Sequence, residues 1–344
     1  MAHALCGLML PPDLSADTLA TVELFPQLDL DGRQLVIVLV KERFVVAPDG
    51  SVERAGDAEI RPVDVPWDEP PQSLKLPSDL CVRKPCTDVV VAARAMARDR
   101  APVRTLDVLV RVGPVEKVLR VHGTRVWYRT MTGLGLTPPE PFEDVELRWD
   151  LAWGGCDLQE GKKPIEEARN PVGRGVVRDP ATLVHQPGPQ IEDPRAPITA
   201  HASFHEPAGV APIGRHWEPR RRYVGTMDEL WRKERLPLLP ADFDDRHNQC
   251  APPYLIAPGR LRGGELVQLG GMCADGALQF ALPRIVFYVG SVRDEGTIEH
   301  RAELDTVLLL PNERALEMTW RAVVPMTRPM RRVREILVYE KEQL

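Results

Sequence analysis

The chain has 344 residues, of which 43% are hydrophobic and 27% are charged, values typical of a folded globular protein. Its net charge of −6 disfavours general nucleic-acid binding, because such proteins are more often basic. No apolar run approaches the roughly 20 residues of a membrane helix, and the start of the chain lacks the basic segment of a secretory signal. We therefore expect a cytoplasmic protein whose partners include neither nucleic acid nor membrane.

The first third of the sequence predicts β-strands. Residues 34–52 are rich in β-branched side chains and contain a turn signal at Pro48-Asp49-Gly50. In residues 105–130, two strand-like runs join at Gly113-Pro114, and the first alternates apolar and polar positions. We expect its apolar side chains to share one face of a strand: Leu106, Val108, Val110 and Val112.

Residues 141–260 are irregular and rich in proline and glycine. Their clearest helix is expected near residues 227–236, because Thr226 and Glu229 fit a capping box. Pro237 is expected to end this helix. Three apolar side chains at helical spacing support it: Met227, Leu230 and Trp231.

Residues 261–344 return to strand-like alternation, and a turn around Pro311 and Asn312 predicts a hairpin. One predicted apolar face comes from each strand: Ala302, Leu304, Thr306, Leu308 and Leu310 from the first, and Leu316, Met318, Trp320, Ala322 and Val324 from the second.

The predicted fold class is mainly β, with antiparallel sheets in a sandwich- or barrel-like arrangement. Long helical patterns between strands are absent, which disfavours a parallel sheet with crossover helices. The predicted fold also contains a long Pro/Gly-rich central region and few short helices. We expect one domain over residues 1–344; its alternative description is two β-rich lobes, 1–140 and 261–344, joined by the irregular segment 141–260.

Familiar catalytic and cofactor motifs do not occur in the sequence, so we assign no catalytic residues, no metal and no cofactor. There is no GxSxG elbow and no P-loop. The six cysteines form no CxxC pair, and we expect free thiols. The loop Asn170–Val177 contains Gly173 and Gly175 but not the third glycine of a dinucleotide fingerprint, so it is read as a tight turn.

Two small clusters could hold a ligand, and the sequence leaves both open. His201 and His205 have a spacing that suits a metal on a helix, but flanking prolines favour a surface or hydrogen-bonding role. Asp244, Asp245 and His247 could supply acid–base chemistry if burial separated their pKa values. A hydrolase or transferase with this site, and the Asn170–Val177 loop as an anion cradle, is the alternative to a non-enzymatic function.

An arginine- and tryptophan-rich stretch runs from Gly214 to Trp231. Between Arg215 and Arg246, eight basic residues face seven acidic ones, so the region is nearly neutral and unlike a phosphate-binding patch. We favour structural use, with guanidinium groups paired to nearby carboxylates. Because Trp, Tyr and Arg dominate binding hot spots, a partner surface is the functional alternative. Its candidates are Trp153, Arg215, Trp217, Arg220, Arg222, Tyr223 and Trp231.

An ordered series of motifs carries a family resemblance. The series is SDLCVRKPCTDVVV (Ser78–Val91), ELRWDLAWGGCD (Glu146–Asp157), RNPVGRGV (Arg169–Val176), the block Pro207–Pro253 and LRGGELVQL (Leu261–Leu269). Over about residues 20–325 it resembles the family called domain of unknown function 2169. Positions of these motifs that we read as structural are Gly154, Gly155, Asn170, Pro171, Gly173, Gly175, Gly225, Asp242 and Asp244.

The resemblance implies a function that the residues alone do not show. It implies a non-enzymatic, cytoplasmic bacterial adaptor or chaperone that binds a type VI secretion effector. The adaptor would help to load this effector onto the VgrG or PAAR spike. It implies no catalytic residues.

Overall fold

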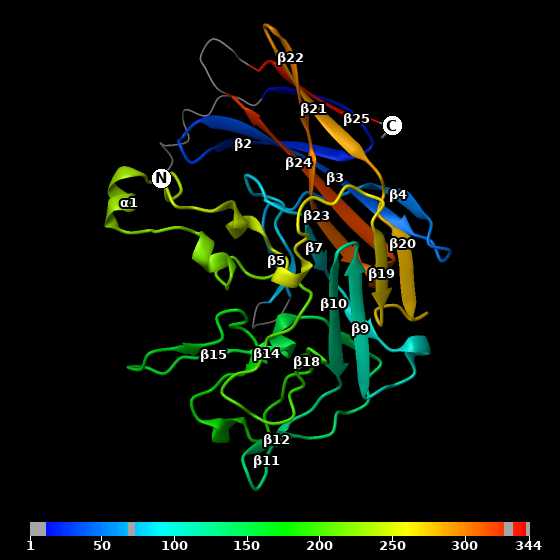
Figure 1. The fold of residues 1–344 in the computed structure, drawn as a ribbon, viewed down its shortest axis with the longest axis vertical. Coiled ribbons are helices and arrows are strands. Elements are labelled where there is room, and N and C mark those ends of the chain that lie inside the picture. The colour runs from blue at the N-terminus through cyan, green and yellow to red at the C-terminus, as the bar shows by residue number, and fades with distance from the viewer. Residues whose placement is uncertain (1–11, 68–72, 327–332, 342–344) are drawn as a thin grey trace.

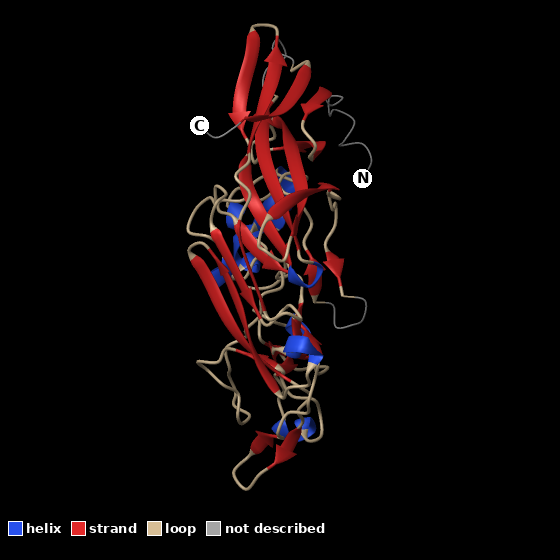
Figure 2. Ribbon diagram, turned by 90° about the vertical axis from the view of Figure 1, so that its right-hand side faces the viewer, coloured by secondary structure: helices blue, strands red, loops and turns tan. Residues whose placement is uncertain are grey.

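A computed structural model describes residues 12–67, 73–326 and 333–341, and the fold is mainly β, as predicted (Figure 1). Three large sheets follow one another along an elongated molecule (Figure 2). None of the sheets in the described residues closes into a barrel. Within the same residues, no helix has the length and apolar character needed to cross a bilayer.

The largest sheet has the strand order β2-β3-β24-β23-β7, and β4 also pairs with β3. Neighbouring strands are antiparallel except β7, which lies parallel to β23. The bounds are β2 (Thr21–Leu28), β3 (Gln34–Val46), β4 (Val52–Asp57), β7 (Asp88–Val91), β23 (Glu303–Leu310) and β24 (Ala315–Pro325).

Two further sheets flank it, with the orders β18-β10-β9-β19-β20 and β1-β25-β21-β22. Every large sheet joins strands from both ends of the sequence, so the lobes 1–140 and 261–344 are not separate sheets. Alternation marks a strand in a sequence but not its partner. The bounds are β9 (Thr105–Val112), β10 (Val115–His122), β18 (Ile191–Glu192), β19 (Leu266–Gly270), β20 (Ala277–Ala281), β1 (Asp13–Asp17), β21 (Val286–Arg293), β22 (Gly296–Arg301) and β25 (Glu335–Lys341).

The remaining elements are short. Five two-stranded ladders pair β5 (Val65–Pro66) with β6 (Leu74–Leu76), β8 (Arg94–Met96) with β13 (Asp144–Glu146), β11 (Trp127–Arg129) with β12 (Leu134–Leu136), β14 (Trp153–Gly154) with β17 (Arg174–Gly175) and β15 (Cys156–Asp157) with β16 (Ile165–Glu166). The α-helix of the described residues is α1 (Glu229–Glu234). Single 3-10 turns lie at Arg98–Arg100, Trp149–Leu151, Pro180–Leu183, Arg220–Tyr223, Asp245–Asn248, Pro253–Leu255 and Pro311–Glu313.

The predicted strand faces are confirmed in β9, where Val108, Val110 and Val112 are fully buried. The hairpin around Pro311 is confirmed as β23 and β24. One predicted face of this hairpin is wrong, because a bulge lies between Leu304 and Thr306. Leu304 pairs with Trp320, but Thr306 pairs with the next residue, Thr319. Directly paired residues share a face, so Thr306, Leu308 and Leu310 lie opposite Leu304.

The two faces of the largest sheet are both buried but differ in chemistry. Val36, Val38 and Val40 of β3 face the main apolar core. On the other face, Lys41 lies 2.7 Å from Asp79 and 3.1 Å from Glu317, and all three side chains are buried. Removing one partner of such a network would leave a buried charge unpaired. Specific ion pairs therefore help to fix the segments around Arg61 and Asp79 over this face.

Candidate functional site

The first half of the arginine- and tryptophan-rich stretch is part of the core. Trp217 is 1% exposed, and its ring lies edge-on to Trp149 with ring centroids 6.1 Å apart. Arg220 is 4% exposed; its Nε donates to the carbonyl of His247 at 2.9 Å and its Nη1 to that of Ile213 at 2.7 Å. Burial lowers the pKa of Arg220. Both residues therefore stabilise the fold, as the structural reading predicted.

The other arginines of this half are on the surface. Arg222 pairs with Glu218 at 2.7 Å, which confirms the expected carboxylate partners. Arg215 lies 3.6 Å from Asp64. Tyr223 is half-buried, and the guanidinium of Arg246, which lies outside the stretch, covers its ring. A partner-binding role for Arg215, Arg222 and Tyr223 stays a prediction.

The second half of the stretch belongs to a closed surface loop, residues 225–242, which we call the α1 loop. Asp242 closes its base, since its carboxylate accepts the backbone N–H of Thr226 at 2.9 Å and the hydroxyl at 2.7 Å. Gly225 stands at the other side of this base with φ +84°, and a Cβ there would lie 2.7 Å from Pro240. Gly225 and Asp242, which the sequence predicted to be structural, therefore lie together at the base that closes the loop.

The predicted helix cap is wrong. Asp228, not Thr226, caps α1, because its side chain accepts the backbone N–H of Trp231 at 2.8 Å. Thr226 is already engaged by Asp242. The helix is accordingly shorter than predicted and ends at Glu234, with Arg235 as its C-cap.

The α1 loop exposes apolar side chains to solvent, and α1 projects from the side of the molecule (Figure 1). Arg235 seats the loop on the turn between β2 and β3 by donating to the carbonyl of Leu30 at 2.6 Å. Trp231 is half-buried and donates its Nε1 to the carbonyl of Leu238 at 2.9 Å. Four large apolar residues remain exposed: Met227 (48%), Leu230 (61%), Leu236 (56%) and Leu239 (39%). Such clusters are typical of interaction surfaces.

The glycine-rich loop Asn170–Val177 is tightly packed against its neighbours. Asn170 is fully buried and donates from Nδ2 to the carbonyls of Trp149 and Trp153, both at 2.8 Å. A Cβ on Gly173 would lie 2.7 Å from the Cα of Gly154. The backbone N–H of Gly155 donates to the carbonyl of Asn170. Gly175 is packed as closely, since a Cβ there would lie 2.3 Å from the ring of Trp153. A structural role for these positions and for Pro171 beside them stays a prediction.

Trp153, a predicted hot-spot candidate, is buried between two histidines. Its ring centroid lies 5.7 Å from that of His201 and 4.6 Å from that of His205. The Nε2 atoms of the histidines lie 3.1 Å from the carbonyls of Gly175 and Ala200, respectively. Burial lowers the pKa of His205. Among the described residues, no group of three or more His, Cys, Asp or Glu could hold a metal ion.

The acidic cluster is divided among separate partners. Asp244 caps the turn Asp245–Asn248 and pairs with Arg246 at 2.6 Å, which lowers its pKa. Asp245 lies 3.4 Å from Arg83, and burial raises its pKa. His247 contacts the carbonyl of Arg220 through Nδ1 at 3.0 Å, and burial lowers its pKa. Each group therefore has a structural contact of its own.

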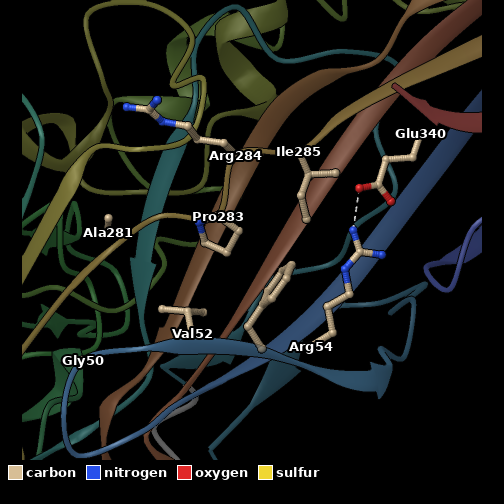
Figure 3. Close-up of a pocket in the computed structure, with 9 residues that line it drawn as sticks. Gly50, Val52, Arg54, Ala281, Pro283, Arg284, Ile285 and Glu340 are labelled. Atoms are coloured by element: carbon tan, nitrogen blue, oxygen red, sulfur yellow. Dashed lines mark hydrogen bonds and ion pairs between the residues drawn. The ribbon is translucent and has the colours of Figure 1, made fainter. Parts of the chain in front are cut away.

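Sequence reasoning missed a groove of about 440 Å³ beside the β3–β4 hairpin (Figure 3). No local signal could have revealed it, because its walls come from four separate segments. Arg54 of β4 and Glu340 of β25 form an ion pair of 2.6 Å across one wall (Figure 3). The lining residues are Phe44, Gly50, Val52, Arg54, Ala281, Pro283, Arg284, Ile285 and Glu340.

Comparison with known families places most of this chain in one group. The family model described as "Uncharacterized protein conserved in bacteria (DUF2169)" matches residues 31–321. The matched region includes the α1 loop and every groove residue except Glu340. No curated protein and no solved structure matches the chain.

Proposed function

Because the chain belongs to the DUF2169 family, we propose that it is a non-enzymatic adaptor that binds a type VI secretion effector. It holds the effector in the bacterial cytoplasm and helps to load it onto the VgrG or PAAR spike. The observation that carries this proposal is the α1 loop, which keeps four large apolar side chains in solvent. Exposed apolar side chains that gather in one loop are typical of a surface that a partner covers.

The anchoring of the α1 loop also suits recognition. Its base is closed by Asp242, and Arg235 ties its far end to the β2–β3 turn. A preformed loop loses less conformational entropy when a partner binds than a free segment would. The apolar side chains are therefore presented by a scaffold that is already ordered.

The groups that an enzyme would need are engaged elsewhere. Asp244, Asp245 and His247 contact Arg246, Arg83 and the carbonyl of Arg220, respectively. The glycine-rich loop, which the alternative function would use as an anion cradle, packs closely against Asn170 and Trp153. These contacts favour an adaptor over a hydrolase or transferase.

Co-purification tests the proposal. The tagged full-length chain is co-expressed with the product of the neighbouring effector gene and with the neighbouring spike protein. We expect the wild type to retain the effector, and Leu230→Asp to reduce retention at least tenfold. Met131→Asp is the matched control, because Met131 is also an exposed apolar residue but lies at the tip of the β11–β12 hairpin.

Two outcomes would contradict different parts of the proposal. Failure of the wild type to retain either protein would overturn the adaptor function. Equal retention by Leu230→Asp and Met131→Asp would leave the adaptor function standing but remove the α1 loop from the interface.

A further inference from the structure

We propose that the groove of Figure 3 binds an extended peptide segment that carries a lysine or arginine side chain. The segment adds as a strand to the free edge of β4 and places its basic side chain beside Glu340. The inference rests on the proposed function in one respect, because the segment would belong either to the effector that the adaptor carries or to the spike protein that receives it. The groove would then be a second interface, separate from the α1 loop.

Apolar side chains form part of the groove lining, beside Arg54, Arg284 and Glu340. Phe44 is 2% exposed and comes from β3, Val52 comes from β4, and Ile285 directly precedes β21. Figure 3 shows Val52 and Ile285 on opposite sides of the open space, with Pro283 between them. The volume of about 440 Å³ falls within the range of roughly 300–1,000 Å³ that ligand pockets occupy. Side chains of an extended segment can therefore be buried here.

The backbone beside this lining is available for pairing. Among the described strands, β4 pairs with β3 alone. The N–H of Ala47 donates to the carbonyl of Ser51 at 2.9 Å, so this pair closes the hairpin. Hydrogen bonding alternates along an antiparallel ladder, which directs the backbone groups of Val52 and Arg54 away from β3. A free edge next to an apolar groove is the geometry of strand addition.

One end of the groove is closed by the hairpin turn. Gly50 approaches the outer edge of β20 so closely that a Cβ would lie 2.6 Å from the carbonyl oxygen of Gln279. At the opposite end of the free edge of β4, a bulge interrupts the β3–β4 pairing just beyond Arg54. The pairing edge is therefore short, which suits a segment of a few residues rather than a whole sheet edge.

One guanidinium serves two carboxylates beside the groove. Glu42 lies two residues before Phe44 on the same face of β3, and its Oε1 is 3.2 Å from Arg54. Glu42 is buried outside the groove lining, and its Oε2 has no hydrogen-bond partner in the described residues. Arg54 also pairs with Glu340, and Figure 3 shows Arg284, the second arginine of the lining, pointing away from Arg54 and Glu340. A lysine or arginine of the segment would give Glu340 a cationic partner of its own.

Protonation of Glu42 makes this recognition dependent on pH. Burial raises the pKa of Glu42 to about 7, Arg54 lowers it and Glu340 raises it. These two residues, from β4 and β25, are the charged groups that face Glu42. Glu42 gains its charge as pH rises through about 7, so affinity for a basic segment should increase over that interval. A free cation would use the carboxylates but neither the apolar side chains of the lining nor the β4 edge, which is why we favour a peptide.

A randomised peptide library displayed on phage, panned on the full-length chain at pH 8, tests the proposal. We expect enriched sequences with alternating apolar positions and a lysine or arginine. Synthetic versions of these peptides should bind at least tenfold more weakly to Glu340→Lys than to the wild type. Glu53→Lys is the matched control, because Glu53 is exposed and pairs with Val45, which is itself exposed on the opposite face of the hairpin.

Glu42→Gln supplies an independent readout. Wild-type affinity for the enriched peptide should rise severalfold between pH 6 and pH 8, and the variant should show no such rise. Circular dichroism at both pH values confirms that each variant is folded.

Three results would overturn the proposal. The first is panning that yields no peptide with a preference for the wild type over Glu340→Lys, and the second is panning that yields only peptides without a basic residue. The third is a dimer, detected by light scattering, that Glu340→Lys dissociates, which would assign the β4 edge to a second copy of the chain. Co-purification tests the adaptor function, and peptide affinity tests the groove. One proposal can therefore fail while the other remains supported.

Discussion

Residues 214–223 and the α1 loop are neighbours in one arginine- and aromatic-rich region, yet the structure uses them in opposite ways. The first segment buries Trp217 and Arg220, whereas the α1 loop exposes Met227 and Leu230. Similar composition therefore does not imply similar burial. What differs is the surroundings: the first segment packs against Trp149 and the carbonyl of Ile213, whereas the contacts of the loop in the described residues include its own base and the β2–β3 turn.

The largest effect on this comparison is expected from Trp217→Ala. Truncation removes a fully buried ring from the core beside Trp149. Such changes destabilise by about 3–5 kcal/mol, which urea denaturation would measure. A loss below about 1 kcal/mol would mean that the first segment is not part of the core.

Arg220→Met should have the next largest effect. The substitution keeps most of the side-chain length but leaves the carbonyls of Ile213 and His247 without this donor. Two unsatisfied buried acceptors correspond to about 2–4 kcal/mol of lost stability. Arg222→Met is the control, since its pair with Glu218 is exposed to solvent and should contribute little to stability. Equal losses for the two variants would contradict the contrast between buried and exposed arginines.

Glu42→Gln sharpens the comparison, because Glu42 is buried like Arg220 but has an unpartnered oxygen. Its pKa is raised from 4.5 to about 7 in the folded chain. The folded state therefore keeps a proton that the unfolded state loses, and stability falls as pH rises from 4.5 to 7. At pH 8 the variant should be more stable than the wild type by about 1–3 kcal/mol. A wild-type stability that is flat over this interval in denaturation at several pH values would contradict the assignment.

Asp242→Ala tests what closes the α1 loop. Loss of the two contacts with Thr226 should open the base of the loop and cost less stability than the changes in the buried segment. Amide hydrogen exchange should accelerate within residues 226–242 and remain unchanged in residues 214–223. Acceleration in both segments would show that they open as one unit.

Leu230→Asp should have the smallest effect on stability. Leu230 is 61% exposed, and surface substitutions usually change the free energy of unfolding by less than about 0.5 kcal/mol. Thermal denaturation measures this change. A large loss would mean that Leu230 packs within the fold and is not displayed to a partner.

Local patterns predicted much of the fold. The alternation in β9 and the hairpin of β23 and β24 were visible in the sequence, because one buried face imposes period two. The bulge after Leu304 was not visible, since an extra residue leaves no mark on composition. Pairing between distant strands, such as β3 with β24, was equally hidden. Because each large sheet joins strands from both ends of the sequence, the sheets do not follow the two-lobe division.

The candidate surfaces were harder to predict. Thr226 and Asp228 are both good capping residues, and only the approach of Asp242 decides that Asp228 caps α1. Helical spacing of Met227 and Leu230 supported a helix but did not show its surroundings, and both side chains are exposed in the structure. The groove is lined by residues of separate segments, among them Arg54 and Glu340, which no local pattern connects.

The central claim is that the α1 loop contacts a partner while residues 214–223 support the fold. Amide hydrogen exchange of the full chain, alone and bound to the product of the neighbouring effector gene, tests it most directly. We predict slower exchange within residues 226–242 on binding and unchanged exchange in residues 214–223. Protection that leaves residues 226–242 unaffected would contradict the claim.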